Sequence, residues 1–229
     1  FEFTDIAGLV KGASHGEGLG NKFLSHIREV DAIVEVVRCF DDKNIIHVDG
    51  EVDPIRDIEV INLELIFSDL EIIDNRINKI AKKAQTSKNK DDLKEYNLLL
   101  RIKENLEKNI PARKLEFDCD EQKILSGFRL ITAKPIIYVA NVSEEDIMTG
   151  ENEYVKTVKE YASNENSKVV MICAKIESEL AELELEEKTA FLNDLGIEES
   201  GLSSLIKSTY SLLGLATYFT VGTDEVKAW

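Results

Sequence analysis

Three short apolar runs rich in β-branched residues recur along this chain, and they constrain its fold more than any other feature. They cover residues 32–40, 135–140 and 168–173. Runs of this length without an alternating polar face are typical of strands buried on both faces of a parallel sheet. Helical patterns lie between them, so the sequence predicts an α/β domain with a doubly wound, mainly parallel sheet.

A further strand is expected at the start of the chain. Residues 1–7 alternate apolar and polar side chains and then meet a segment, 8–20, that holds five of the 12 glycines. Helical spacing follows over 21–30. The strand, the glycine loop, the helix and the run at 32–40 together predict a βαβ unit.

Two long helical patterns interrupt this alternation. Apolar residues at helical spacing run from Asp57 to about Ala84, a polar turn follows at 85–92, and a second helical stripe runs on until Pro111 stops it. Two long helices joined by a short polar turn form an antiparallel hairpin. We therefore expect an inserted coiled-coil arm over residues 57–115.

Charge is unevenly distributed along the 229 residues, whose formal net charge is -16. Residues 76–114 hold 12 Lys and Arg against 5 acids, a net of +7, so the remainder carries -23. The acidic total alone argues weakly against a nucleic-acid partner, but a projecting basic arm can bind RNA phosphates in a salt-dependent way. A solvated hairpin with surface lysines is the alternative. Aromatic residues do not interleave with the lysines, so sequence-specific recognition of RNA or DNA is not expected.

The composition also bears on the compartment. No run approaches the ~18 apolar residues of a membrane span, so we expect a cytoplasmic protein with no membrane partner. Three scattered cysteines are too few for a disulfide framework or a zinc site. Cys39 and Cys173 each end a strand pattern and are expected to pack in the core.

The first candidate site lies where the strand at 1–7 meets the glycine loop. Asp5 and Gly8 form a D-x-x-G motif there. An Asp at the carboxyl end of a parallel strand can hold the water shell of Mg²⁺, and the N–H of the Gly can reach a γ-phosphate. Taken alone, the motif also describes an ordinary turn at the end of a strand.

Two further motifs follow the later strands. N-V-S-E stands at 141–144 and C-A-K at 173–175. P-loop nucleotide hydrolases present an N-K-x-D and an S-A-K loop at these two strand ends, and both loops contact the base. The joint occurrence, in order, predicts a nucleotide-binding site whose base-side residues are Asn141, Val142, Glu144, Cys173, Ala174 and Lys175.

These motifs carry a resemblance to a known family. Residues 5–24 resemble the switch II region of the Obg class of GTPases. The wider string, including 38–40, 44–48 and 54–62 with the N-x-x-E motif, resembles the YchF branch of that class, the Obg-like ATPases. The resemblance covers essentially the whole chain. It implies a P-loop NTPase-type fold with a coiled-coil insertion, and an ATP-hydrolysing regulatory switch that associates with ribosomes.

The resemblance also implies a domain organisation and a set of cofactors. Residues 1–56 and 116–214 would form the nucleotide-hydrolase domain, 57–115 the arm, and 215–229 the beginning of a TGS domain. ATP, Mg²⁺ and a monovalent cation such as K⁺ are the implied cofactors. The arm and the TGS module would contact the ribosome or its RNA.

The phosphate-binding loop of such a fold is not found in these residues. No G-x-x-x-x-G-K-[ST] sequence occurs within the 229 residues, and the strand order would place it before Phe1. We therefore expect a piece of a longer protein. We also expect this polypeptide alone to bind ATP poorly, and tight binding by calorimetry would contradict that.

Glu144 gives a partial physical account of the implied preference for ATP. In a guanine-specific loop the last-position Asp accepts hydrogen bonds from guanine N1 and N2, whereas adenine has no hydrogen on N1 and no 2-amino group. Glu144 is one methylene longer, so that contact should be misplaced, and a lost buried hydrogen-bond pair costs ~1–3 kcal/mol. Two alternatives stay open, a GTPase of the wider Obg class and a non-enzymatic RNA-binding or ribosome-binding scaffold with an incomplete nucleotide site.

The water-positioning group is a further departure from small GTPases. Leu9 follows the D-x-x-G glycine, where those enzymes place a Gln, and leucine cannot form a hydrogen bond. The resemblance points to His47 in this role, and His15 in the glycine loop is its rival. His47 could equally be a half-buried strand residue. His26, in the middle of a helix, is expected to be a surface or packed histidine.

Overall fold

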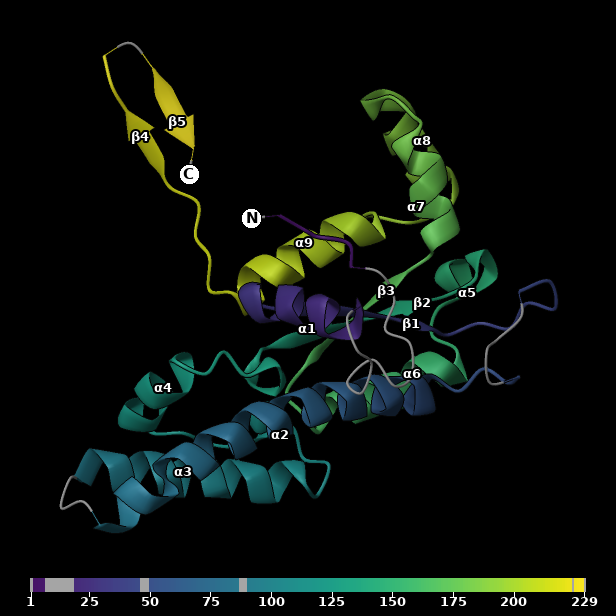
Figure 1. The fold of residues 1–229 in the computed structure, drawn as a ribbon. Helices are drawn as coiled ribbons and strands as arrows, with labels where there is room; N and C mark the ends of the chain where they lie inside the picture. Colours follow the sequence, from purple (N-terminus) through teal and green to yellow (C-terminus); the bar gives the residue numbers. More distant parts are fainter. Residues whose placement is uncertain (1, 7–18, 46–49, 87–89, 224, 229) are drawn as a thin grey trace. The chain divides into compact units, whose positions relative to one another are not determined.

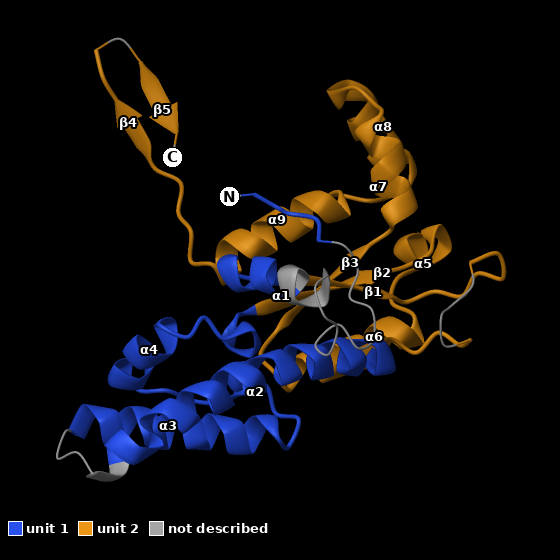
Figure 2. Ribbon diagram, viewed as in Figure 1, with its two compact units in different colours: residues 1–33, 55–135 blue, residues 34–54, 136–229 orange. Residues whose placement is uncertain are grey.

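The structure is a computed structural model that describes residues 2–6, 19–45, 50–86, 90–223 and 225–228. It divides the chain into two compact units, residues 1–33 with 55–135 and residues 34–54 with 136–229 (Figure 2). Each unit has its own buried apolar cluster. Among the described helices, none combines the length and the apolar composition needed to cross a membrane.

The second unit holds the three expected strands, β1 (Ile33–Arg38), β2 (Ile136–Asn141) and β3 (Lys168–Ile172), in the order β1-β2-β3 (Figure 1). β2 and β3 are parallel, with Ile137 opposite Lys168 and Asn141 opposite Ile172. Every residue of β2 but the last is buried, which fits the nearly unbroken apolar sequence of a central parallel strand. The expected α/β class with a parallel sheet is confirmed.

Alternation along the strands decides which helix covers which face of this sheet. Ile137 and Val139 of β2 pack in one cluster with Leu205 of α9 (Gly201–Leu212). Tyr138 points to the other face, where its ring meets Tyr161 of α6 (Glu153–Ser163) edge-on, with the ring centroids 6.0 Å apart. The other helices of the unit are α5 (Glu144–Thr149), α7 (Ala174–Ala181) and α8 (Leu185–Asp194).

A glycine allows α9 to start close to β3. A Cβ added at Gly201 would lie 2.8 Å from Ile172 Cγ1, which is closer than real side chains approach. The N–H of Gly201 also donates to Glu177 Oε1 of α7, at 2.6 Å. The absence of a side chain at 201 therefore allows α9 to start against the sheet, and the bond to Glu177 ties that start to α7.

The first unit contains the long helices of the expected hairpin. α2 (Pro54–Thr86) and α3 (Lys90–Leu106) share one buried cluster that includes Ile73, Ile80 and Leu99. The shorter elements of this unit are α1 (Leu19–Glu29), α4 (Cys119–Ser126) and two 3₁₀ turns, η2 (Ala112–Lys114) and η3 (Ile131–Ala133).

The end of α3 differs from the expectation that Pro111 stops the helix. The helix ends at Leu106, and Asn109 adopts a φ of 59°, the left-handed conformation. The N–H of Ile110 donates to the carbonyl of Asn105, and that of Asn109 to the carbonyl of Leu106. This pattern is a Schellman cap, so Asn109 ends the helix before the proline is reached.

The prediction of a strand over 1–7 is wrong for residues 2–6, the part of that range that the structure describes. Residues 2–6 have no regular secondary structure. A strand requires a neighbouring backbone to pair with its N–H and C=O groups, and the described sheet consists of β1, β2 and β3 alone. Alternating polarity by itself was therefore not enough to form a strand there.

The tail of the second unit forms the expected hairpin. Gly214, with a φ of 63°, follows α9, and the chain then forms β4 (Phe219–Val221) and β5 (Val226–Ala228). The two strands are antiparallel, with Phe219 opposite Ala228. Whether 215–229 begins a TGS domain stays a prediction.

Candidate functional site

The two loops expected to face a nucleotide base lie side by side at the carboxyl edge of the sheet. Asn141 is the last residue of β2, and Ala174 is the first residue of α7, just beyond β3. The backbone N–H of Ala174 donates to Asn141 Oδ1 at 3.1 Å. The N–H of Val142 donates to the carbonyl of Ile172 at 2.9 Å, so the parallel ladder continues into the first loop.

An ion pair also joins the two loops. Glu144 opens α5, whose cap is the hydroxyl of Ser143, and its Oε1 contacts Lys175 Nζ. This contact raises the pKa of Lys175, because the hydrogen bond and the charge of Glu144 favour the protonated amine. The two side chains are 42% and 70% exposed, so the pair adds little to stability. Its effect is on chemistry, since it gives the Glu144 carboxylate a cation partner.

Asn141 retains a donor for a ligand. Its Oδ1 is taken by the N–H of Ala174, which leaves the side-chain NH₂ group to donate. A donor at this place suits a ring nitrogen acceptor that adenine and guanine share. Asn141 therefore fits a purine without selecting between the two bases.

Two of the expected base-side residues are buried in the core. Val142 is 2% and Cys173 4% exposed, and Cys173 packs against Ile176 and Leu180 of α7. Their side chains stabilise the loops, so a base could meet only their backbone groups. The prediction that Cys39 and Cys173 pack in the core is confirmed, since both side chains are buried.

The residues expected on the phosphate side are only partly described. Asp5 lies in the first compact unit and is exposed. Gly8 and His47, together with Leu9 and His15, lie outside the described residues. His26 is exposed on α1, in accord with a surface histidine.

The carboxylates among the described residues decide how a magnesium ion could be held. Within the described ranges, no group of three or more His, Cys, Asp or Glu residues could hold a metal ion. Mg²⁺ at nucleotides keeps several waters and takes most of its remaining ligands from phosphate oxygens, with one or two carboxylates. A single exposed carboxylate such as Asp5 fits that ion through a water molecule.

Sequence reasoning missed the residue that organises the loop after β1. Arg38 donates from Nε to the carbonyl of Phe40 and from a terminal nitrogen to that of Ile45, both at 3.0 Å, and also to the carbonyl of Asp42 at 3.3 Å. Its guanidinium lies 4.9 Å from the centre of the Phe40 ring. An arginine at the end of a mostly apolar strand was the available signal.

The start of α6 holds the same loop from another side. Asn152, the cap of α6, donates to the carbonyl of Cys39 at 2.7 Å. Tyr154 donates to Asp41 Oδ2 at 2.9 Å, and this bond raises the pKa of the tyrosine. The loop that leads toward residue 47 is therefore anchored up to Ile45.

No protein-family model matches the chain. It is 60% identical over 230 residues to the ribosome-binding ATPase YchF of Bacillus subtilis, covering 100% of this chain and 63% of that protein. The ribosome-binding ATPase YchF of Escherichia coli O157:H7 is 47% identical over 228 residues, covering 100% of this chain and 62% of that protein.

A solved structure agrees with these relatives. The structure of the Schizosaccharomyces pombe YchF GTPase matches with a TM-score of 0.82 at 36% identity, over 96% of this chain and 60% of that one. The fold is thus the α/β, parallel-sheet fold of P-loop nucleoside triphosphate hydrolases. Over its whole length the chain is homologous to the YchF proteins. It spans less than two thirds of the length of these relatives.

Proposed function

We propose that this chain forms part of an ATP-hydrolysing switch of the YchF type that acts on ribosomes in the cytoplasm. The single observation that carries the proposal is the joining of the two base-side loops, through the bond from Ala174 to Asn141 and the ion pair of Glu144 with Lys175. Relatives named ribosome-binding ATPase YchF, homologous over the whole chain, support it.

Each site residue has a role in this proposal. The Asn141 amide donates to the purine ring, the backbones of Val142 and Cys173 and residue Ala174 flank the base, and Glu144 with Lys175 closes its edge. Glu144 is a poor guanine acceptor for two reasons, since it is one methylene longer than Asp and already has a cation partner. A preference for adenine follows.

The phosphate side completes the proposed site. Asp5 would hold Mg²⁺ through water, the N–H of Gly8 would sense the γ-phosphate, and His47 would orient the attacking water where Leu9 cannot. When bound, Mg²⁺ neutralises the charge that develops on the phosphate oxygens. A requirement for a monovalent cation such as K⁺ belongs to the same proposal, and comparison of turnover in K⁺ and Na⁺ salts tests it.

The arm and the tail hairpin are the proposed ribosome contacts. We assign 57–115 to the arm, 1–56 and 116–214 to the nucleotide-hydrolase domain, and 215–229 to the beginning of a TGS domain. Lys79 and Lys90 support the role of the arm, because both are exposed and neither has an ion-pair partner among the described residues. Contact with RNA phosphates by such groups is salt-dependent and independent of sequence.

The test is ATP turnover by the natural gene product with and without ribosomes. We expect hydrolysis that ribosomes stimulate, and we expect His47→Ala to reduce kcat by about 10²-fold or more, as loss of a group that positions the nucleophile does. His26→Ala is the matched control and should retain full turnover. No nucleotide turnover in either condition would favour the ribosome-binding scaffold. Wild-type turnover in His47→Ala would contradict the role of His47 alone.

A further inference from the structure

The outer edge of the parallel sheet is unpaired in the described structure. β3 ends the strand order, and among the described residues no strand pairs with its far side. The carbonyl of Ile172 faces β2, because it accepts from the N–H of Val142. Since backbone groups of a parallel strand alternate in direction, those of Val170 face β2 as well, and those of Val169 and Met171 face outward. An outward row of this kind is a template for a further strand.

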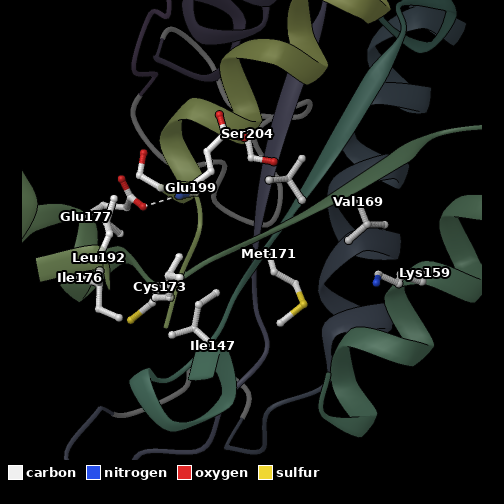
Figure 3. A pocket seen from close by; sticks show the side chains of 14 residues that line it. Ile147, Lys159, Val169, Met171, Cys173, Ile176, Glu177, Leu192, Glu199 and Ser204 are labelled. Atoms are coloured by element: carbon white, nitrogen blue, oxygen red, sulfur yellow. Dashed lines mark hydrogen bonds between the residues drawn. The ribbon is translucent and has the colours of Figure 1, made fainter. Parts of the chain in front are cut away.

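A hollow of about 270 Å³ lies along this edge (Figure 3). It is lined by side chains from both faces of the sheet, with Lys159 of α6 on one side and Ser204 of α9 on the other. Val169 and Met171 lie along it, and Ile176 and Leu192 provide an apolar wall. Strand addition uses such an arrangement. The main-chain hydrogen bonds to the edge provide affinity, and the apolar hollow receives alternate side chains of the added strand.

The neighbouring helices determine which kind of peptide fits. Residues 174–199, which include α7 and α8, hold nine acids and two lysines, a net of -7. Of the nine, Glu199 pairs with Lys207 at 2.7 Å, and no ion pair is found for the other eight in the described part of the chain. Seven of them are exposed: Glu179, Glu182, Glu184, Glu186, Glu187, Asp194 and Glu198. Glu177 and Glu199 line the hollow itself, and the segment that continues from it through α7 and α8 is strongly and almost uniformly negative.

The cation on the opposite side does not change this balance. Lys159 is in contact with the carboxylate of Glu151, so its charge is already compensated. Glu177, at the inner wall, accepts from the N–H of Gly201 and stays acceptor-only when ionised. A ligand entering the hollow meets apolar side chains in the middle and carboxylates along the α7–α8 side.

We propose that the β3 edge, together with the acidic α7–α8 flank, binds an extended, lysine-rich or arginine-rich segment of a partner protein as an added strand. Its backbone bonds to Val169 and Met171, and alternate apolar side chains enter the hollow. Its cations face the acids of α7 and α8. Cys173 lines both this hollow and the proposed nucleotide site, but the added strand bonds to Val169 and Met171, so the proposal does not rest on the proposed function.

The test uses a dye-labelled K-V-K-L-K-V-K peptide and the ¹⁵N-labelled natural gene product. We expect saturable binding that weakens with salt, and amide exchange slowed at least about tenfold at Val169 and Met171 but unchanged at Val170 and Ile172, which already face β2. Two control peptides, E-V-E-L-E-V-E and the basic peptide with proline at its centre, should not bind. Binding without this alternating protection would overturn the proposal.

Substitutions separate the backbone from the charge. Val169→Pro removes one outward N–H and leaves the ladder to β2 intact, as proline can on an edge strand, whereas Val169→Ala retains the N–H. We expect about tenfold weaker binding for the proline variant only. If that variant fails to fold, the triple change of Glu179, Glu182 and Glu198 to Gln decides, with an expected loss of about tenfold. Glu59, Glu71 and Glu116 changed to Gln in the other unit form the matched control and should bind as wild type.

Two outcomes would assign the edge differently and overturn the proposal. Equal loss in both triple variants would mean that attraction is by net charge rather than by this flank. A concentration-dependent dimer by sedimentation, with Val169 and Met171 protected before any peptide is added, would mean that a second copy of the chain occupies the edge.

Discussion

The basic segment at 76–114 and the acidic segment at 174–199 carry equal and opposite net charge, +7 and -7, but differ in how many of their charged side chains are paired. In the basic segment at least six of the twelve cations are held in ion pairs: Arg76, Lys83, Lys94, Arg101, Lys103 and Lys108. Of the nine acids in the acidic segment, Glu199 is the one with an ion pair among the described residues. Equal net charge therefore does not mean equal charge available to a partner.

Asp69, on α2 within the arm at 57–115, is a charged residue whose partners all lie within the fold. Asp69 of α2 is fully buried and accepts from Arg28 at 2.7 Å, from the N–H groups of Ile131 and Thr132, and from the Thr132 hydroxyl. Arg28, on α1, also donates to the carbonyl and hydroxyl of Ser68. A carboxylate with these partners is part of the core rather than of a surface.

The largest expected effect follows from that network. Asp69→Ala leaves Arg28 and the two N–H groups without their acceptor, so we expect a loss of about 3–5 kcal/mol in the free energy of unfolding by urea. Glu182→Ala in the acidic segment is the control and should stay within about 0.5 kcal/mol of wild type. Equal losses in the two variants would remove the contrast between a charge bonded within the core and an exposed, unpaired one.

The two exposed, unpaired lysines of the arm come next. Lys79→Ala with Lys90→Ala should weaken binding to ribosomes by about tenfold or more near 0.15 M salt, and lower the salt slope by about 1 per lysine, because each contact releases a counterion. Lys108→Ala should lose less, since Lys108 already pairs with Glu104 at 2.8 Å. Sedimentation with ribosomes over a salt series measures both quantities. An equal loss for Lys108→Ala would show that pairing does not limit availability.

One acid of the acidic segment, Glu177, is an exception because it is bonded within the fold. Glu177 accepts from the N–H of Gly201 at the start of α9. Glu177→Ala should therefore cost about 1–2 kcal/mol, as loss of a side chain that satisfies a helix N-terminus does. Thermal unfolding measures the melting temperature of this variant against that of Glu179→Ala, which is expected to be nearly neutral. If the two variants melt alike, the bond to Gly201 adds nothing.

The smallest expected effect concerns Lys175. Glu144 raises the pKa of this lysine, so any stability from the pair is present below the ordinary lysine pKa and is lost as the pH rises through the raised value. Glu144→Gln should lower the pKa of Lys175 toward its ordinary value, as followed by an NMR titration of the side chain. An unchanged pKa would mean that the two loops are not joined by this pair in solution.

Much of the fold could be predicted because the signals are local. The run at 135–140 is apolar throughout and forms the buried strand β2, and the run at 168–173 is apolar after Lys168 and forms the partly buried strand β3. The hairpin helices follow from their apolar spacing. The end of α3 was misjudged because Pro111 is the stronger signal in sequence, whereas the cap depends on the φ of Asn109.

Less of the site and of the charge balance could be predicted, because both depend on residues far apart in sequence. The motifs at 141–144 and 173–175 indicated loops at neighbouring strand ends, but the pairing of Glu144 with Lys175 emerges only when the strands lie side by side. Likewise, Asp74, Asp120 and Glu121, which neutralise cations of the basic segment, lie outside it in sequence. A count over a segment cannot include them.

The most direct test of the proposed function is the ratio of kcat/KM for ATP to that for GTP, measured by competition on the natural gene product with ribosomes present. We predict a ratio of about ten or more, because in the proposed site the longer side chain of Glu144 misplaces the paired contact to guanine. Glu144→Asp should move the ratio toward GTP. A ratio of one or less for the wild type would contradict the account and indicate a GTPase.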